Sequence, residues 1–108
     1  MNISIQQAQS GDIHNIAEIH QLTFIRQKNS DQWIASTFAA YPRYICYVLH
    51  YNDQIVGYIF WTQKSGFRSE VILELDQIAI HPDFQGKGLS RGLIQDSLKL
   101  LQAELEQN

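Results

Sequence analysis

The residues best suited to chemistry lie in a short stretch after an apolar segment, Gln85-Gly86-Lys87-Gly88-Leu89-Ser90. Its two glycines let backbone N–H groups approach a ligand closely, because glycine has no side chain and readily adopts positive φ. A helical pattern begins near Gly88 and adds the positive end of a helix dipole. The stretch therefore predicts a site for phosphate or pyrophosphate, with Lys87 as a nearby cation.

Two other phosphate motifs do not fit this stretch. A P-loop has the form Gly-x-x-x-x-Gly-Lys-Ser/Thr, but residue 81 is His and residue 88 is Gly. The dinucleotide fingerprint Gly-x-Gly-x-x-Gly fails at Arg91. From the glycines alone, a strand-to-helix turn without a ligand stays an equal alternative.

Two carboxylates precede the loop on one predicted strand. Glu74 and Asp76 are two residues apart, so strand alternation places both on the same face of the sheet. A carboxylate there can take a proton from an amine, directly or through water, and attracts a cationic substrate. Solvated polar positions on a half-exposed strand are the alternative.

The loop resembles the Q/R-x-x-G-x-G/A motif of the GNAT N-acetyltransferase superfamily, with Gln85, Gly88 and Ser90 at the three marked positions. Ser90 departs from the usual Gly or Ala, although it is also small. The preceding segment, residues 78–82, is similar to the family's strand that ends in V-x-P. The order of predicted elements along the whole chain resembles the first part of the family fold.

This resemblance implies an acetyl-CoA-dependent N-acyltransferase that moves an acetyl group to a small-molecule or peptide amine. The pyrophosphate of coenzyme A would lie on the amides of residues 85–90, and the pantetheine arm along the backbone of residues 78–80. Glu74 falls where some family members place a catalytic glutamate, and Asp76 is the second candidate. The implied cofactor-binding residues are Ile78, Ala79, Ile80, Gln85, Gly86, Lys87, Gly88, Leu89 and Ser90.

The elements that must position these residues form one predicted domain, residues 1–108, of the α+β class. We expect a mixed, largely antiparallel sheet flanked by helices, in the order β-α-α-β-β-β-α. Apolar periodicity of two or 3.6 residues separates strands from helices. It predicts strands at residues 2–7, 44–51, 55–62 and 70–80, and helices at residues 13–24 and 30–38 and from about residue 88 onward.

Helix caps, a loop and a turn are also expected. Residues 10–12 and Ser30 or Asp31 are candidate helix caps, residues 52–54 a turn, and residues 65–69 a loop. Several aromatic residues suit either an acceptor pocket or the core, and their spacing favours the core: Phe24, Trp33, Tyr58, Phe60 and Trp61.

Composition limits the partners. The net charge is −3 and the basic residues are scattered, which argues against nucleic acid and anionic membranes as partners. There is no signal-peptide pattern and no apolar run of the roughly 20 residues that span a bilayer. The four histidines lack zinc-ligand spacing, so no metal site is predicted. We expect a cytoplasmic protein.

Members of the family usually continue beyond this helix, with a region that carries a tyrosine to protonate the leaving thiolate. Every tyrosine here precedes residue 59, so the resemblance supplies no candidate for that proton donor. Two alternatives therefore stay open. One is a non-catalytic CoA-binding or regulatory module, and the other is a C-terminally short domain completed as a homodimer through the open edge of the strand that ends at Ile80.

Overall fold

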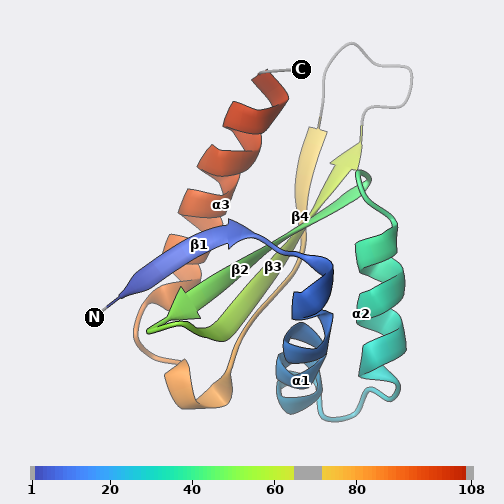
Figure 1. The fold of residues 1–108 in the computed structure, drawn as a ribbon, viewed down its shortest axis with the longest axis vertical. Helices are drawn as coiled ribbons and strands as arrows, with labels where there is room; N and C mark the ends of the chain where they lie inside the picture. The colour runs from blue at the N-terminus through green and yellow to red at the C-terminus, as the bar shows by residue number, and fades with distance from the viewer. Residues whose placement is uncertain (1, 65–71, 107–108) are drawn as a thin grey trace.

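The computed structural model describes residues 2–64 and 72–106 (Figure 1). Its α+β fold confirms the predicted class and order of elements. The predicted loop at residues 65–69 and the first two residues of the predicted strand 70–80 lie outside the described residues. The elements are β1 (Ile3–Gln7), η1 (Ser10–Asp12), α1 (Ile13–Thr23), α2 (Ser30–Ala39), β2 (Tyr44–Tyr51), β3 (Gln54–Lys64), β4 (Ile72–Ile80), η2 (Pro82–Phe84) and α3 (Leu89–Glu106).

The strands form one sheet in the order β1-β2-β3-β4. All three pairings in the described part of the chain are antiparallel, so the sheet there is simpler than the mixed sheet expected. Helices α1 and α2 cover one face and α3 covers the other (Figure 1). In the part of the chain that the structure describes, the strand order makes β4 an edge strand, and the Gln85–Ser90 stretch follows it.

Each face of the sheet packs against helices through residues at alternate strand positions. Phe60 of β3 packs with Ile16 and Ile34 of the α1–α2 layer. Its neighbour Trp61 packs with Leu93 and Leu101 on α3. This alternation is the strand period of two, and the α3 contacts follow the 3.6-residue helical period. The core therefore holds the sheet between two helical layers.

The β2–β3 hairpin turns at Asn52 and Asp53, as predicted. Both residues have positive φ (51° and 69°), which matches the right-handed twist of a two-residue hairpin. The N-cap residue of α1 is Asp12, within the predicted residues 10–12, whereas the cap of α2 differs from expectation. Asn29, with φ of 63°, precedes α2, while Ser30 is its first helical residue and uses its hydroxyl in a buried network described below.

A β-bulge lies in the pairing of β3 with β4, beside the predicted site. Phe60 pairs with Gln77, and the next residue, Trp61, pairs with Leu75, so the register passes over Asp76. A bulge re-aims side chains and increases local twist, and bulges are common near active sites. Here the bulge brings Asp76 and Gln77 to one cavity on the α1–α2 face.

Gly57 of β3 permits a close approach of β4. A Cβ at residue 57 would lie 2.7 Å from Ile80 Cδ1 and 3.2 Å from the Ala79 carbonyl oxygen. The Ile80 side chain can rotate away from an added Cβ, but the Ala79 carbonyl belongs to the sheet backbone and cannot move without shifting β4. We therefore expect Gly57→Ala to lower the free energy of unfolding by roughly 1–3 kcal/mol. Urea denaturation measures this change, and an unchanged midpoint would show that β4 yields easily.

None of the helices in the described residues is both long and apolar enough to cross a membrane.

Candidate active site

The loop between β4 and α3 is ordered by local contacts. The His81 Nδ1 atom accepts a hydrogen bond from the Asp83 N–H at 3.1 Å, which caps the short helix η2. Gly86 and Gly88 then adopt φ of 82° and 74°, in the left-handed region that favours glycine. Helix α3 begins at Leu89. Both glycines therefore adopt the positive φ that the sequence predicts, and they turn the chain sharply into the helix.

Backbone amides of this loop are available to a ligand. Among the described residues, the N–H groups of Gly86 and Gly88 donate no hydrogen bond to a backbone carbonyl. The first N–H groups of α3, at Leu89 and Ser90, have no intrahelical acceptor by helix geometry. A Cβ on either glycine would meet nothing within 4 Å. The arrangement suits an anion.

Gln85 differs from the other loop residues. Its N–H donates to the Pro82 carbonyl at 3.4 Å, so this amide is already engaged within the protein. Its side-chain Nε2 donates to the Ile80 carbonyl at 2.9 Å. Gln85 therefore ties the loop to the end of β4, which fixes the position of the free amides that follow.

A cavity of about 260 Å³, here called the loop cavity, joins the loop to β4 and α1. It contains eight of the nine cofactor-binding residues that the resemblance implies, while Lys87 is not among its lining residues. Two further residues, Thr23 of α1 and Phe84 of η2, complete the wall. The lining residues are Thr23, Ile78, Ala79, Ile80, Phe84, Gln85, Gly86, Gly88, Leu89 and Ser90.

The open edge of β4 borders this cavity. The His81 N–H donates to the Val56 carbonyl at 2.7 Å, so residue 81 directs its backbone toward β3. Strand alternation then directs the backbone of Ala79 toward β3 and that of Ile78 and Ile80 toward the open edge. Since Gln85 occupies the Ile80 carbonyl, the groups at this edge without a partner among the described residues are the Ile80 N–H and both backbone groups of Ile78.

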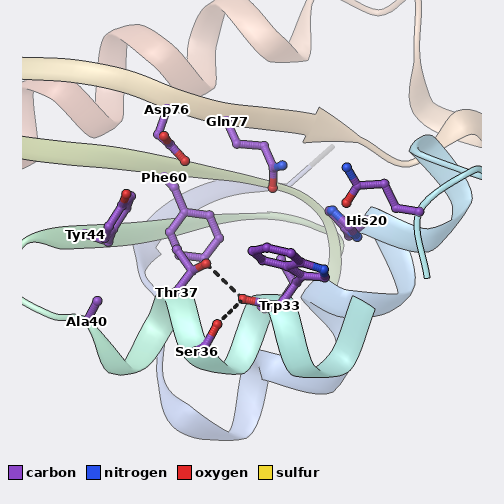
Figure 2. Close-up of a pocket in the computed structure, with 11 residues that line it drawn as sticks. His20, Trp33, Ser36, Thr37, Ala40, Tyr44, Phe60, Asp76 and Gln77 are labelled. Atoms are coloured by element: carbon purple, nitrogen blue, oxygen red, sulfur yellow. Dashed lines mark hydrogen bonds between the residues drawn. The ribbon is translucent and has the colours of Figure 1, made fainter. Parts of the chain in front are cut away.

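A second cavity, here called the α2 cavity, has a volume of about 410 Å³ and lies between α2 and the sheet (Figure 2). Asp76 points from β4 toward α2, and Gln77 lies beside it. The Gln77 Oε1 atom accepts a hydrogen bond from the Tyr58 hydroxyl at 2.7 Å. The lining residues are His20, Gln27, Trp33, Ile34, Ser36, Thr37, Ala40, Tyr44, Phe60, Asp76 and Gln77.

The two predicted carboxylates have different surroundings. Asp76 lines the α2 cavity, whereas Glu74 does not. The Glu74 Oε2 atom lies 3.0 Å from Lys64 Nζ, in an exposed ion pair between β3 and β4. Asp76 is therefore the carboxylate that a ligand in the α2 cavity would meet.

The aromatic candidates divide between pocket and core. Trp33, with 60% of its surface exposed, and Phe60 line the α2 cavity. Tyr58 and Trp61 are buried in the core, and Phe24 packs against it.

Two further residues that line the cavities, His20 and Thr23, were not predicted from the sequence. His20 of α1 is buried and lines the α2 cavity. Its Nδ1 atom lies 2.7 Å from Ser30 Oγ. Thr23, one turn later, lines the loop cavity, and its Oγ1 is buried without a hydrogen-bond partner. The available signal was polar residues on the otherwise apolar stripe of this helix.

The two cavities are lined by neighbouring residues of the same two elements, β4 and α1. Gln77 in the α2 cavity is followed directly by Ile78 in the loop cavity. On α1, His20 and Thr23 are three residues apart, so they share a helix face. In the described part of the chain, no group of three or more His, Cys, Asp or Glu residues is placed to hold a metal ion. Among the residues that line the two cavities, Asp76 is the carboxylate and His20 is the imidazole.

Solved structures share this fold. A GNAT family acetyltransferase from Brucella melitensis, in complex with acetyl-CoA, is 19% identical with a TM-score of 0.77, over 95% of this chain and 70% of that one. One from Staphylococcus aureus is 16% identical with a TM-score of 0.74, over 93% and 78%. The ribosomal-protein-S18-alanine N-acetyltransferase from Escherichia coli is 21% identical with a TM-score of 0.70, over 95% and 61%.

A comparison with curated proteins gives no match. The family model described as an acetyltransferase (GNAT) domain matches residues 42–108, which is more than half of the chain and includes β4, the loop and α3. The same residues carry the glycine turn, the free amides and the open strand edge. On this match, the chain belongs to the GNAT acetyltransferase family.

Proposed function

We propose that this protein transfers an acetyl group from acetyl-CoA to a small primary amine. The observation that carries the proposal is the loop cavity, which joins the free amides after Gly86 to the open edge of β4. Adjacent to it, the α2 cavity offers a separate space for the acceptor. A donor and an acceptor bound in these cavities would meet beside residues 77 and 78.

The loop cavity suits the cofactor in two parts. The amides of Gly86, Gly88, Leu89 and Ser90 would hold the pyrophosphate at the start of α3, where the helix dipole favours negative charge. The pantetheine amides would pair with the open edge at Ile78 and Ile80, as an added strand does. Lys87 would act from outside the cavity as a cation beside the phosphates.

The α2 cavity suits a small cationic acceptor. Its volume, about 410 Å³, lies within the range of small-molecule sites. Asp76 supplies a negative charge, and Trp33 supplies an aromatic face that attracts cations. We assign the carboxylate role to Asp76 rather than Glu74, because Glu74 faces Lys64 outside this cavity. Asp76 would bind the ammonium form of the amine and orient it.

The reaction then follows from this placement. After loss of one proton, the amine nitrogen attacks the thioester carbonyl carbon, and a C–N bond forms. The C–S bond breaks, the electron pair stays on sulfur, and the second amine proton neutralises the thiolate. The products are the acetylated amine and coenzyme A, with one proton released to solvent.

Thr23 offers a test of the loop cavity. Because its buried hydroxyl lacks a partner, we expect Thr23→Val to raise the free energy of unfolding by about 1 kcal/mol. If the hydroxyl bonds the cofactor, the same change weakens acetyl-CoA binding by about ten-fold. Thermal unfolding and calorimetry measure the two effects. Unchanged affinity would mean that the hydroxyl does not contact the cofactor.

The edge of β4 also bears on the homodimer expected from the sequence. A second copy paired at residues 78–80 would occupy the backbone groups that the cofactor needs. Acetyl-CoA and this form of dimer would therefore exclude each other. Sedimentation with and without acetyl-CoA tests this relation, and a dimer that persists at saturating cofactor would contradict it.

A thiol-release assay over a panel of amines tests the proposed activity. The panel would contain small alkylamines, aminoglycosides and peptides with a free N-terminus, each with acetyl-CoA. We expect release of coenzyme A that depends on the amine and is fastest for small cationic amines. Release at the same rate with and without amine would reduce the activity to thioester hydrolysis and contradict the proposal.

A further inference from the structure

We infer that His20 takes the proton that the acceptor amine gives up, and that Nε2 is the receiving atom. This inference rests on the proposed function, because it concerns an amine in the α2 cavity. Three features carry it: the direction of a hydrogen-bond chain, the access of Nε2 to the cavity, and the charges around the ring.

The hydrogen-bond chain fixes which ring nitrogen carries the proton. The Gln27 carbonyl can only accept, so the Gln21 group 3.2 Å from it is the Nε2 donor. The Gln21 Oε1 atom therefore faces Ser30, and the Ser30 hydroxyl donates to it at 2.9 Å. With its one hydrogen used, Ser30 Oγ accepts from His20 Nδ1 at 2.7 Å. His20 is thus held as the Nδ1–H tautomer, with a lone pair on Nε2.

The Nε2 atom opens onto the α2 cavity. It has no hydrogen-bond partner among the described residues. Among the described residues, the side-chain atoms that are fully buried and lack a partner are Thr23 Oγ1 and His50 Nδ1. His20 Nε2 is not among them, so this atom retains some exposed surface. Since His20 lines the α2 cavity, we infer that this free nitrogen is reached from that cavity; Figure 2 shows the His20 ring at the end of the cavity away from Asp76.

The surroundings keep the ring neutral and ready to accept. Burial lowers the pKa of the His20 imidazole below its ordinary value. The titratable groups that share the α2 cavity are Asp76 of β4 and Tyr44 of β2, while α2 meets the ring through the hydroxyl of Ser30. Near neutral pH the site therefore holds one carboxylate and one neutral imidazole, which suits a single ammonium group.

The step balances in atoms and charge. The ammonium in the α2 cavity gives one proton to His20 Nε2, directly or through water, and the imidazole becomes an imidazolium whose Nδ1–H still donates to Ser30. The neutral amine attacks the thioester, and its second proton passes to the thiolate as the C–S bond breaks. The imidazolium then returns its proton to solvent.

His20→Asn tests the role of Nε2 with little change in packing. The asparagine amide can still donate to Ser30 from near the Nδ1 position, but nothing replaces Nε2. We expect kcat to fall about a hundred-fold, with an unchanged KM for acetyl-CoA. In the wild type, kcat should fall as the pH drops through the His20 pKa, because the imidazolium cannot accept a proton. This fall of kcat at low pH should be absent in His20→Asn.

His14→Asn is the matched control. His14 lies on the same helix, its side chain is 82% exposed, and its Nδ1 is 3.9 Å from Asp31 Oδ1, outside both cavities. It should leave kcat and its pH profile unchanged. Ser30→Ala is a second variant that leaves the imidazole in place and frees its tautomer, and it should lower kcat about ten-fold. Thermal unfolding establishes that each variant is folded.

The outcomes separate this inference from the proposed function. A wild type that acetylates no amine in the panel would overturn both. An active wild type with a folded His20→Asn variant within two-fold in kcat, and with the same pH profile, would overturn only the role of His20. A two-bond ¹H–¹⁵N spectrum of the wild type at neutral pH should show the Nδ1–H tautomer, and the Nε2–H tautomer would contradict the assignment without any activity measurement.

Discussion

Replacing Gly88 by aspartate is expected to weaken acetyl-CoA binding by at least about a hundred-fold. Gly88 lines the loop cavity with φ of 74°, and its N–H donates to no backbone carbonyl among the described residues. A carboxylate there would stand beside the pyrophosphate, and two like charges about 4 Å apart repel by about 4 kcal/mol near a protein surface. Calorimetric titration with acetyl-CoA measures the loss.

Two further variants isolate the charge from other effects. Gly88→Asn has nearly the same size and the same tolerance of positive φ as the aspartate but no charge, so it should lose much less affinity. Gly92→Asp places the same charge four residues later, on α3 and away from the loop cavity. Equal losses for Gly88→Asp and Gly88→Asn would mean that shape, not phosphate charge, governs this position.

Replacing Asp76 by asparagine is expected to raise KM for the amine about ten- to a hundred-fold. A hydrogen bond to a charged group contributes roughly 1.5–3 kcal/mol, and Asp76 is the carboxylate of the α2 cavity. KM for acetyl-CoA should not change, because the loop cavity does not include Asp76. Steady-state kinetics with each substrate varied in turn gives both constants.

Glu74→Gln is the matched comparison for this carboxylate. Glu74 lies two residues earlier on β4 and loses only its exposed pair with Lys64 in this variant. An exposed pair of this kind contributes at most about 1 kcal/mol. We expect a change in KM for the amine of less than two-fold. A large effect in Glu74→Gln and none in Asp76→Asn would assign the catalytic carboxylate to Glu74.

The loop was predictable from the sequence because its conformation is local. Gly86 and Gly88 are the residues that can adopt positive φ between a strand and a helix, and both do so. The elements were predictable for a related reason, since the apolar period of two or 3.6 residues reports which face is buried. The two-residue turn at Asn52 and Asp53 follows from the same kind of local preference.

Features that depend on long-range pairing were not predictable in this way. The bulge that brings Asp76 into the α2 cavity arises from the register of β4 against β3, and no glycine or proline marks it in the sequence. The hydrogen bond from the Gln85 N–H to the Pro82 carbonyl forms only because the short helix η2 brings these two residues together. The His20 chain depends on the loop that returns α2 to α1, and it draws Ser30 away from the capping role expected of it.

The most direct measurement is a calorimetric titration of the wild-type protein with acetyl-CoA. The free amides at the start of α3 and the open edge of β4 predict saturable binding at one site per chain, lost in Gly88→Asp and kept in Gly92→Asp. No detectable heat of binding at millimolar cofactor, from protein whose fold is intact, would contradict the assignment of the loop cavity to coenzyme A.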